Sequence, residues 1–394
     1  MSSQLSDRVQ RIKPSATIAV TARAAALRAS GIDVIGLGAG EPDFDTPDHI
    51  KQAANEAIAQ GFTKYTAVDG IAELKSAIID KFRRDNELEF EANQILVSTG
   101  AKQTIFNLVH ALINAGDEVV IPAPCWVSYP DIVKLAGGTP VIPLAGVDQA
   151  FKISASQLAD ALTPKTRLLM LNSPCNPTGA SYSRADLAAM GDVLKDYPDV
   201  IIATDDMYEH IFWDAEPFCS FAQACPDLAD RTVTINGVSK AYAMTGWRIG
   251  YCGGPADLVA AMKKLQSQST SNACSIAQKA AAAALAGDQA CVGEMTRAFR
   301  ERHDFVVGAL NEVPGFSCAA GAGTFYAFPE VGEAVKRLGL ADDAALAEHL
   351  IEKARVALVP GSAFEAPGYL RLSFATDMDT LKTAIGRIQD CLSA

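Results

Sequence analysis

The chain has 394 residues, of which 49% are hydrophobic and 20% charged, and its formal net charge is −12. A chain of this length is typical of two or three domains, and an acidic surface argues against nucleic acid as the main ligand. No stretch approaches the roughly 20 apolar residues of a membrane span, and the start MSSQLSDRVQRIKPSAT lacks the apolar core of a signal peptide. We therefore expect a cytoplasmic protein that binds small molecules and has neither a nucleic-acid nor a membrane partner.

Six apolar runs in the middle of the chain predict strands. They are residues 94–98, 118–122, 139–144, 166–172, 199–205 and 231–236. Helical patterns at 101–116, 126–137 and 184–197 alternate with them. Because the strands are continuously apolar, helices should cover both faces of their sheet. The alternation predicts a doubly wound, mostly parallel sheet.

The pattern of apolar and charged residues changes after Gly287. A long charged helix is predicted over GEMTRAFRERHDFVVGALNEV, and it is followed by the short strands TFYAFP, VALVP and YLRLSFA. This pattern indicates a second, smaller α+β domain.

Neither the cysteines nor the histidines form a known ligand pattern. The nine cysteines are scattered and include no C-x-x-C pair, which is typical of reduced thiols in the cytoplasm. The five histidines include no H-x-x-x-H pair. We therefore expect no metal site.

Polar and aromatic side chains follow the ends of the predicted strands. In open parallel sheets, ligands bind at the carboxyl ends of the strands, which meet at one edge. The segments at these ends are Ser98–Lys102, Cys125–Trp126, Asn172–Gly179, Asp205–Tyr208 and Ser239–Lys240. An amide, a carboxylate, a phenol, an indole and a lysine are thus expected to line one crevice.

Lys240 is the most informative of these residues. It lies in NGVSKAYAMTGWRIGY among small and apolar neighbours, where an amine is partly neutral and nucleophilic. The carbonyl compound that most often uses a resident lysine is pyridoxal phosphate, which serves as an electron sink. Arg248 and the helix start at Ala101 and Lys102 suit the phosphate of that cofactor.

Four further residues match the other needs of pyridoxal phosphate. Asp205 can keep the ring nitrogen protonated, Tyr208 and Asn176 can donate to the phenolic oxygen, and Trp126 can stack on the ring. Each has a structural explanation when taken alone, such as a helix N-cap for Asp205, a turn for Asn176 or a core position for Trp126. Lys240 alone is also explained as a solvated loop lysine. Taken together, and in the order in which the strands carry them, these residues favour the cofactor site.

Several longer motifs occur in order along the chain. They are KPSAT, AGEPDFDTP, TKYTAVDGI, STGAKQ, PCWVSYP, NSPCNPTG, TDDMYEH, NGVSKAYAMTGWRIGY, SQSTSN and YLRLSFAT. Through them the chain resembles, over essentially its whole length, the class I (fold-type I) pyridoxal-phosphate aminotransferases. More narrowly, it resembles the bacterial branch that includes the aspartate/prephenate aminotransferases. One departure is Thr324, which stands where the family usually has Ala or Gly.

The resemblance implies the fold-type I α/β architecture, with a large doubly wound, mostly parallel sheet domain and a smaller α+β domain. It divides the chain into an N-terminal arm with part of the small domain (1–45), a large pyridoxal-phosphate-binding domain (46–286) and a small C-terminal domain (287–394).

The resemblance also implies roles for the predicted site residues. Lys240 would be the catalytic residue that carries the cofactor, Asp205 would pair with the ring nitrogen, and Trp126 would stack on the ring. Tyr208 and Asn176 would contact the phenolic oxygen. The groups implied to hold the phosphate are Ser239, Arg248, the backbone amides of Ala101 and Lys102, and Tyr65 from a neighbouring subunit. The last of these implies a homodimer with shared active sites.

A substrate site is implied beside the cofactor. Arg371 would clamp the α-carboxylate of an amino acid, helped by the backbone of Gly40, with Trp126 and Asn176 alongside. The candidates for binding a distal carboxylate are Lys102, Thr17 and Lys13. The alternative that Lys13 and Lys102 are only solvated, or lie beside the phosphate, stays open.

These residues predict an aspartate aminotransferase with ping-pong kinetics, which converts L-aspartate and 2-oxoglutarate to oxaloacetate and L-glutamate, with prephenate as a second acceptor. Two enzymatic alternatives remain: an aminotransferase of aromatic or other neutral amino acids, and a pyridoxal-phosphate-dependent lyase on the same fold. A ligand-sensing regulator would need an additional DNA-binding domain, for which the family's length leaves no room.

Overall fold

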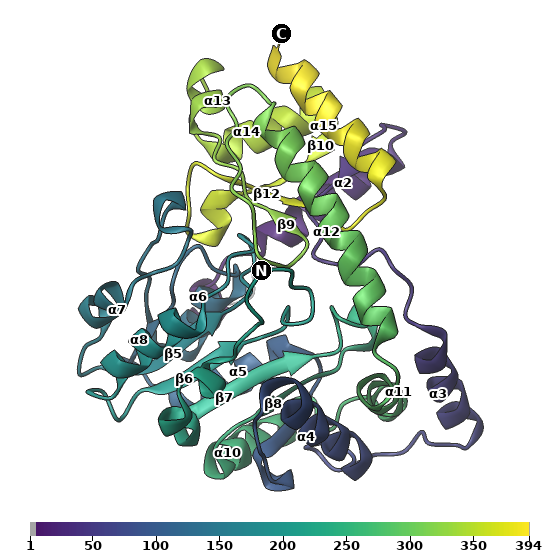
Figure 1. Cartoon of the computed structure of the whole chain (residues 1–394), viewed down its shortest axis with the longest axis vertical. Coiled ribbons are helices and arrows are strands. Elements are labelled where there is room, and N and C mark those ends of the chain that lie inside the picture. Colours follow the sequence, from purple (N-terminus) through teal and green to yellow (C-terminus); the bar gives the residue numbers. More distant parts are fainter. Residues whose placement is uncertain (1–4, 394) are drawn as a thin grey trace.

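A seven-stranded sheet forms the centre of the larger part of the molecule (Figure 1). The computed structural model describes residues 5–393. The strands are β2 (Ile95–Ser98), β3 (Glu118–Val120), β4 (Thr139–Val141), β5 (Thr166–Asn172), β6 (Ile201–Asp205), β7 (Thr232–Gly237) and β8 (Gly250–Gly253). Their order is β2-β8-β7-β6-β5-β3-β4, and every neighbouring pair is parallel except the two that involve β8. The predicted mostly parallel sheet is therefore confirmed.

The six predicted strands all occur in this sheet, some of them shorter than their apolar runs. The sequence analysis missed β8, which is antiparallel to both of its neighbours. Its four-residue sequence, GYCG, begins and ends with glycine and is too short to show a hydrophobic pattern. β8 nevertheless joins β2 to the rest of the sheet.

Helices cover both faces of the sheet. They are α3 (Asp48–Ala59), α4 (Ala72–Asn86), α5 (Ala101–Leu112), α6 (Ser128–Ala136), α7 (Ala155–Ala161), α8 (Arg184–Leu194), α9 (Phe221–Ala224), α10 (Ala256–Ser267) and α11 (Ser275–Ala286). Leu168 of β5 shares a buried cluster with Ile105 of α5, whereas the next residue, Leu169, packs in another cluster with Leu187 of α8. Alternate residues of β5 thus meet different helical layers, which explains why this strand is apolar on both faces.

A smaller sheet lies at the other end of the molecule. It is antiparallel, in the order β11-β12-β9, and consists of β9 (Tyr326–Ala327), β11 (Val359–Pro360) and β12 (Leu370–Ser373). The helices of this region are α2 (Ala16–Ala29), α13 (Gly332–Arg337), α14 (Asp343–His349) and α15 (Met378–Ser393). The long helix α12 (Ala290–Asn311) runs from the large sheet towards this end (Figure 1).

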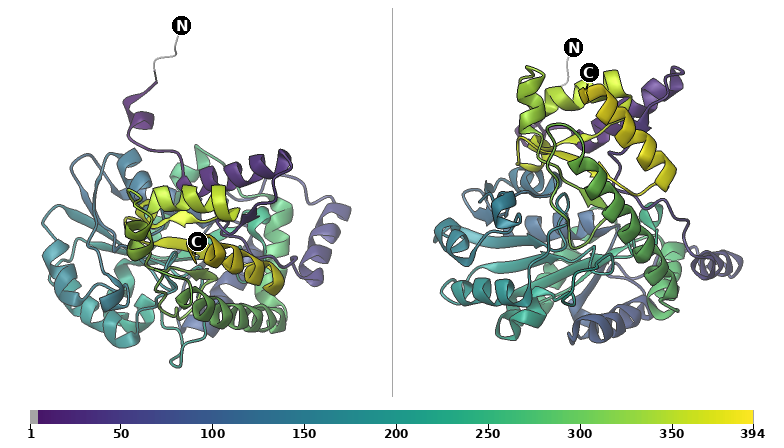
Figure 2. Two further views of the ribbon diagram at one scale, coloured as in Figure 1. Left: turned by 90° about the horizontal axis from the view of Figure 1, so that it is seen from above. Right: turned by 45° about the horizontal axis from the view of Figure 1, so that its top comes forward.

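The N-terminal region belongs in space with the C-terminal region. β1 (Ile35–Gly36) pairs in parallel with β10 (Val356–Ala357), and α2 packs near both. The short helix α1 (Asp7–Gln10) lies at the rim of the molecule, on the segment that extends outward in the left view of Figure 2. This arrangement supports the division that we propose: residues 1–45 and 287–394 on one side and 46–286 on the other.

The carboxyl ends of β2, β5, β6 and β7 meet at one edge of the large sheet, because these strands run parallel to one another. The loops at this edge, together with β12 of the small sheet, surround the cavity described next.

Between residues 5 and 393, no helix has both the length and the apolarity needed to cross a bilayer.

Candidate active site

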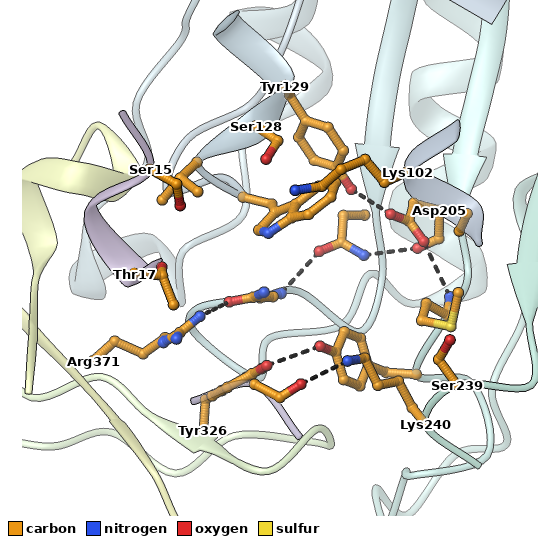
Figure 3. A pocket seen from close by; sticks show the side chains of 18 of the residues that line it. Ser15, Thr17, Lys102, Ser128, Tyr129, Asp205, Ser239, Lys240, Tyr326 and Arg371 are labelled. Carbon is orange, nitrogen blue, oxygen red and sulfur yellow. Dashed lines mark hydrogen bonds between the residues drawn. The ribbon is translucent and has the colours of Figure 1, made fainter. Parts of the chain in front are cut away.

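A cavity of about 260 Å³ lies at the carboxyl edge of the large sheet, against the small sheet (Figure 3). The predicted site residues that line it are Thr17, Gly40, Ala101, Lys102, Trp126, Asn176, Asp205, Tyr208, Ser239, Lys240, Arg248 and Arg371. The structure therefore brings together residues that are as much as 354 positions apart in the sequence, from Thr17 to Arg371. Lys13 and Tyr65 do not line this cavity, and their roles stay predictions.

Lys240 follows β7 and reaches into the cavity. Its Nζ donates a hydrogen bond to the backbone oxygen of Gly40 at 2.6 Å. Burial lowers the pKa of Lys240 to about 8; Glu41 opposes this effect, whereas the positive charges of Arg248 and Arg371 add to it. A lysine with this pKa is about one-tenth neutral at pH 7, so its amine is available as a nucleophile and base.

Asp205 is the last residue of β6, and it is almost completely buried. Its Oδ2 accepts a hydrogen bond of 2.6 Å from the hydroxyl of Tyr129, and its Oδ1 accepts one of 3.3 Å from the backbone N–H of Met207. Burial raises the pKa of Asp205, although these two hydrogen bonds oppose the rise. No described residue forms an ion pair with this carboxylate, so a cationic ligand group at this point would meet an unpaired buried acid.

The start of α5 and Arg248 form a narrow cradle beside Lys240. Gly100 has φ of +85°, and a Cβ on it would overlap the guanidinium of Arg248. A Cβ on Gly250 would likewise overlap the backbone of Ala101. The first N–H groups of a helix have no partner within the helix, and here they lie next to a guanidinium. Such a cradle suits an anion, and a phosphate above all.

Arg371 of β12 provides a second, buried cationic group. Its two terminal nitrogens donate to Asn176 Oδ1 at 2.8 Å and to the backbone oxygen of Gly38 at 2.6 Å. The guanidinium lies between two aromatic rings, with its Cζ 4.4 Å from the centre of Tyr326 and 4.8 Å from that of Phe364. Burial lowers the pKa of Arg371, but an arginine stays charged. A rigid guanidinium in this position is suited to a carboxylate.

Lys102 lies on another wall of the same cavity. Its Nζ is 4.8 Å from the centre of the Trp126 indole, and burial, with a smaller effect from Arg248, lowers its pKa. Lys13 lines an adjoining cavity of about 570 Å³ that Lys102 also borders. Tyr65 is 92% exposed on the single chain.

The comparisons with known proteins agree with this geometry. The family model of class I and II aminotransferases matches residues 32–388. The chain belongs to this aminotransferase family. An aspartate/prephenate aminotransferase from Nitrosomonas europaea is 59% identical over 99% of this chain and 100% of its own length, and one from Cereibacter sphaeroides is 53% identical over 98% of each chain.

Solved structures of the same family superpose on the aminotransferase over nearly its whole length. An aspartate aminotransferase from Rhizobium meliloti has a TM-score of 0.95 at 46% identity, covering 100% of this chain and 99% of its own. A Thermus thermophilus aspartate aminotransferase, solved with maleate, has a TM-score of 0.93 at 41% identity, covering 99% and 100%. These findings confirm the family and the fold-type I architecture that the motifs predict.

Two tyrosines of the aminotransferase's cavity were missed in the sequence analysis. Tyr129 belongs to the quoted motif PCWVSYP and lies in the first turn of α6, whereas Trp126 precedes that helix; their rings meet edge to face. Tyr326 belongs to the predicted strand TFYAFP, and nothing in that run distinguishes it from its neighbours. It enters the cavity because β9 pairs with β12, the strand that carries Arg371.

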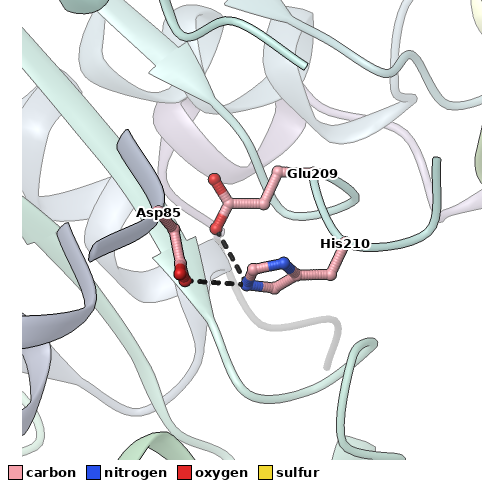
Figure 4. A group of neighbouring side chains, drawn as sticks. All are labelled: Asp85, Glu209 and His210. Carbon is pink, nitrogen blue, oxygen red and sulfur yellow. Dashed lines mark ion pairs between the residues drawn. The ribbon is translucent and has the colours of Figure 1, made fainter. Parts of the chain in front are cut away.

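A second cluster of ionisable groups lies outside the cavity (Figure 4). His210 Nε2 is 3.3 Å from Asp85 Oδ2 and 3.3 Å from Glu209 Oε1. Both carboxylates already have cationic partners: the buried Lys81 contacts Glu209, and Arg84 Nε is 2.7 Å from Asp85. The cluster is thus better suited to fixing α4 against the loop after β6 than to binding a metal ion.

Proposed function

We propose that the aminotransferase transfers the amino group of L-aspartate to 2-oxoglutarate, giving oxaloacetate and L-glutamate, and that pyridoxal phosphate is its cofactor. The observation that carries the proposal is the pair of cationic groups, Arg371 and Lys102, which reach the cavity from different sides (Figure 3). Two separate cations suit a substrate with two carboxylates. The names of the similar proteins, and the dicarboxylate maleate in one of their structures, support the same substrate class.

The residues present fit pyridoxal phosphate. Asp205 is a buried carboxylate that forms no ion pair with any residue between 5 and 393, as a protonated ring nitrogen requires. Arg248 and the start of α5 suit the phosphate, and Ser239 lies beside them on the cavity wall. Asn176 has an amide nitrogen without a partner among the described residues, so it can donate to the phenolic oxygen together with Tyr208. Bound there, the cofactor would supply an electron sink for the substrate's α-carbon.

The chain's own residues would then perform three tasks. Arg371 would hold the α-carboxylate and fix the orientation of the bonds at the α-carbon. The neutral amine of Lys240 would take the proton from the α-carbon and deliver it to the cofactor carbon that bears the transferred nitrogen. Trp126 would cover the site on one side and limit the entry of water. Because the first product, the oxo acid, leaves before the second substrate binds, the kinetics should be ping-pong.

We also propose that the enzyme uses prephenate as a second acceptor and that it acts as a cytoplasmic homodimer with shared sites. Prephenate appears in the names of relatives at 53–59% identity. Tyr65 is almost fully exposed and lies outside the cavity of its own chain, which fits a contact with the phosphate site of a second subunit. The cysteines of the described chain are free thiols, as is usual in the cytoplasm.

A panel of substrates tests the proposed reaction. Aspartate, glutamate, phenylalanine and tyrosine serve as donors, and oxaloacetate, 2-oxoglutarate and prephenate as acceptors. We expect aspartate and 2-oxoglutarate to give one glutamate for each oxaloacetate formed. A lyase would consume the amino acid without producing glutamate, and an aromatic aminotransferase would prefer phenylalanine or tyrosine to aspartate. Either result would overturn the proposal.

Lys102 should determine the preference for dicarboxylates. We expect Lys102→Ala to raise the KM for aspartate about 10- to 100-fold, because one charge-assisted hydrogen bond to a carboxylate is lost. The KM for phenylalanine should change less than about twofold, since its side chain has no carboxylate to lose a partner. The measurement is steady-state kinetics with both donors.

A matched lysine serves as the control for this variant. Lys134 is on α6, borders only the adjoining cavity, and lies 3.7 Å from Asp131. Lys134→Ala should leave both KM values unchanged. An equal rise for aspartate and phenylalanine in Lys102→Ala would show that Lys102 acts on the cofactor instead of on the distal carboxylate.

A further inference from the structure

We propose that Tyr326 is a positioning residue whose hydroxyl donates a hydrogen bond to the hydroxyl of Tyr208, and so strengthens Tyr208 as a donor to the phenolic oxygen of the cofactor. The inference rests on the proposed function, because it assumes that pyridoxal phosphate occupies the cavity. None of the roles predicted from the sequence includes Tyr326, which belongs to the small sheet.

The backbone brings Tyr326 to the cavity in a fixed place. It is the first residue of β9 and pairs with Ser373 of β12, two residues after Arg371. Before it, Thr324 has φ of +69°, which is unusual for a β-branched residue, and its Oγ1 accepts a hydrogen bond of 3.2 Å from the backbone N–H of Tyr326. Both residues are buried, so the side chain of Tyr326 has little freedom to move.

The hydroxyls of Tyr208 and Tyr326 are 3.0 Å apart (Figure 3). Tyr208 is 5% exposed and Tyr326 1%, so each hydroxyl depends on partners inside the cavity. In such a pair one hydroxyl donates and the other accepts. If Tyr326 donates, Tyr208 keeps its own proton for a ligand, and no other described side chain takes that proton.

The surrounding charges favour Tyr326 as the donor. Arg371 lies over the ring of Tyr326, with its Cζ 4.4 Å from the ring centre. Burial raises the pKa of both tyrosines, but Arg371 is the chief influence that opposes the rise for Tyr326. The pKa of Tyr208 is raised further, by burial and by Tyr326 itself; Arg371 opposes this rise as well, and Asp205 adds to it. The more acidic hydroxyl is the better donor.

Tyr326 also touches the segment that holds Lys240. A Cβ on Gly40 would overlap the hydroxyl of Tyr326, and the backbone oxygen of Gly40 accepts the hydrogen bond from Lys240. The charged groups around the two hydroxyls are thus Arg371 of β12, Asp205 of β6 and Lys240 after β7. Tyr326 lies between the group proposed to bind the substrate carboxylate and the residues proposed to hold the cofactor.

The alternative is that Tyr326 only fills space beneath Arg371. Phenylalanine would fill the same space and keep its ring under the guanidinium, so only the hydroxyl distinguishes the two roles. The effect of the hydroxyl should depend on Tyr208, because Tyr208 is the group through which it acts. Comparison of single and double variants therefore separates the roles.

The experiment uses four purified enzymes loaded with pyridoxal phosphate: wild type, Tyr326→Phe, Tyr208→Phe and the double variant. The readout is the pH midpoint at which the visible absorbance of the bound cofactor changes. A donor to the phenolic oxygen favours its anionic form, so loss of the Tyr208 hydroxyl should raise the midpoint. We expect Tyr208→Phe to raise it by about 0.3 to 1 pH unit, the effect of one neutral hydrogen bond, and Tyr326→Phe to raise it by about 0.1 to 0.3 pH unit, because the Tyr326 variant weakens that bond without removing it. In the Tyr208→Phe background, the same change should have no further effect.

Other outcomes would overturn the inference. A midpoint equal to that of the wild type in Tyr326→Phe would show that its hydroxyl does not act on Tyr208, and equal shifts in both backgrounds would show that it acts independently. The control is Tyr182→Phe, which removes a buried hydroxyl that accepts from the N–H of Ile153 outside the cavity. It should leave the midpoint unchanged. A wild type that binds no cofactor would contradict the proposed function itself, and the two failures are thus distinguishable.

Discussion

Replacement of Lys240 by alanine is expected to lower kcat more than about 10⁴-fold, because the variant loses both the covalent anchor of the cofactor and the base that moves the α-proton. The structure provides the physical reason. Burial lowers the pKa of Lys240 to about 8, and Arg248 and Arg371 hold further positive charge nearby. The measurements are steady-state kinetics with aspartate and mass spectrometry after borohydride reduction, which should find a pyridoxyl group on Lys240 of the wild type alone.

Two variants complete this experiment. Lys240→Arg keeps a cation at the position but offers no neutral amine near pH 7, so it should be as inactive as the alanine variant. Lys195→Ala removes an exposed lysine that pairs with Asp192 on the surface, and it should keep both the activity and the label. Labelling of a different lysine in the wild type would contradict the assignment of Lys240.

The centre of the large sheet was predictable because its strands are mostly buried on both faces and are followed by distinctive residues. The runs before Asn172 and Asp205 are apolar over four positions, and a helical pattern separates the two. Residue pairing within the small sheet was less accessible. β9 and β11 have two residues each, and such short strands carry no periodicity of their own.

The residues of the site also differ in how far the sequence alone could place them. Residues at the carboxyl ends of parallel strands, such as Asp205 and Lys240, could be placed together from topology alone. Tyr326 could not, because its position depends on the antiparallel register of β9 and β12. The roles of Arg371 and Thr17 came from the family resemblance, since no local pattern links them to the sheet edge. Interactions that depend on tertiary contact, such as that of Lys81 with Glu209, leave no signal in the sequence.

Replacement of Asp205 by asparagine is expected to lower kcat about 10²- to 10⁴-fold, which corresponds to the loss of one partner of a buried ion pair. The amide keeps the shape of the side chain, but its single oxygen can accept only one of the two hydrogen bonds that the carboxylate accepts, and it cannot balance a positive ring nitrogen. That nitrogen would then lose its proton and attract electrons less strongly. The measurement is the rate of a single half-reaction with aspartate, followed by the absorbance of the cofactor.

Two further experiments show whether charge is the cause. A cofactor analogue that is methylated on the ring nitrogen carries a permanent positive charge, so it should restore a large part of the lost rate in Asp205→Asn and add nothing in the wild type. Tyr129→Phe removes the hydroxyl that donates to Asp205 at 2.6 Å but leaves the carboxylate in place. Its loss in rate should be about 10-fold or less, because the carboxylate keeps its charge beside the ring and the lost hydrogen bond acts on the ring only through it. Two results together would contradict a role for the charge: no restoration of the rate by the analogue, and a loss of rate in Tyr129→Phe as large as that in Asp205→Asn. The carboxylate would then act by shaping the site.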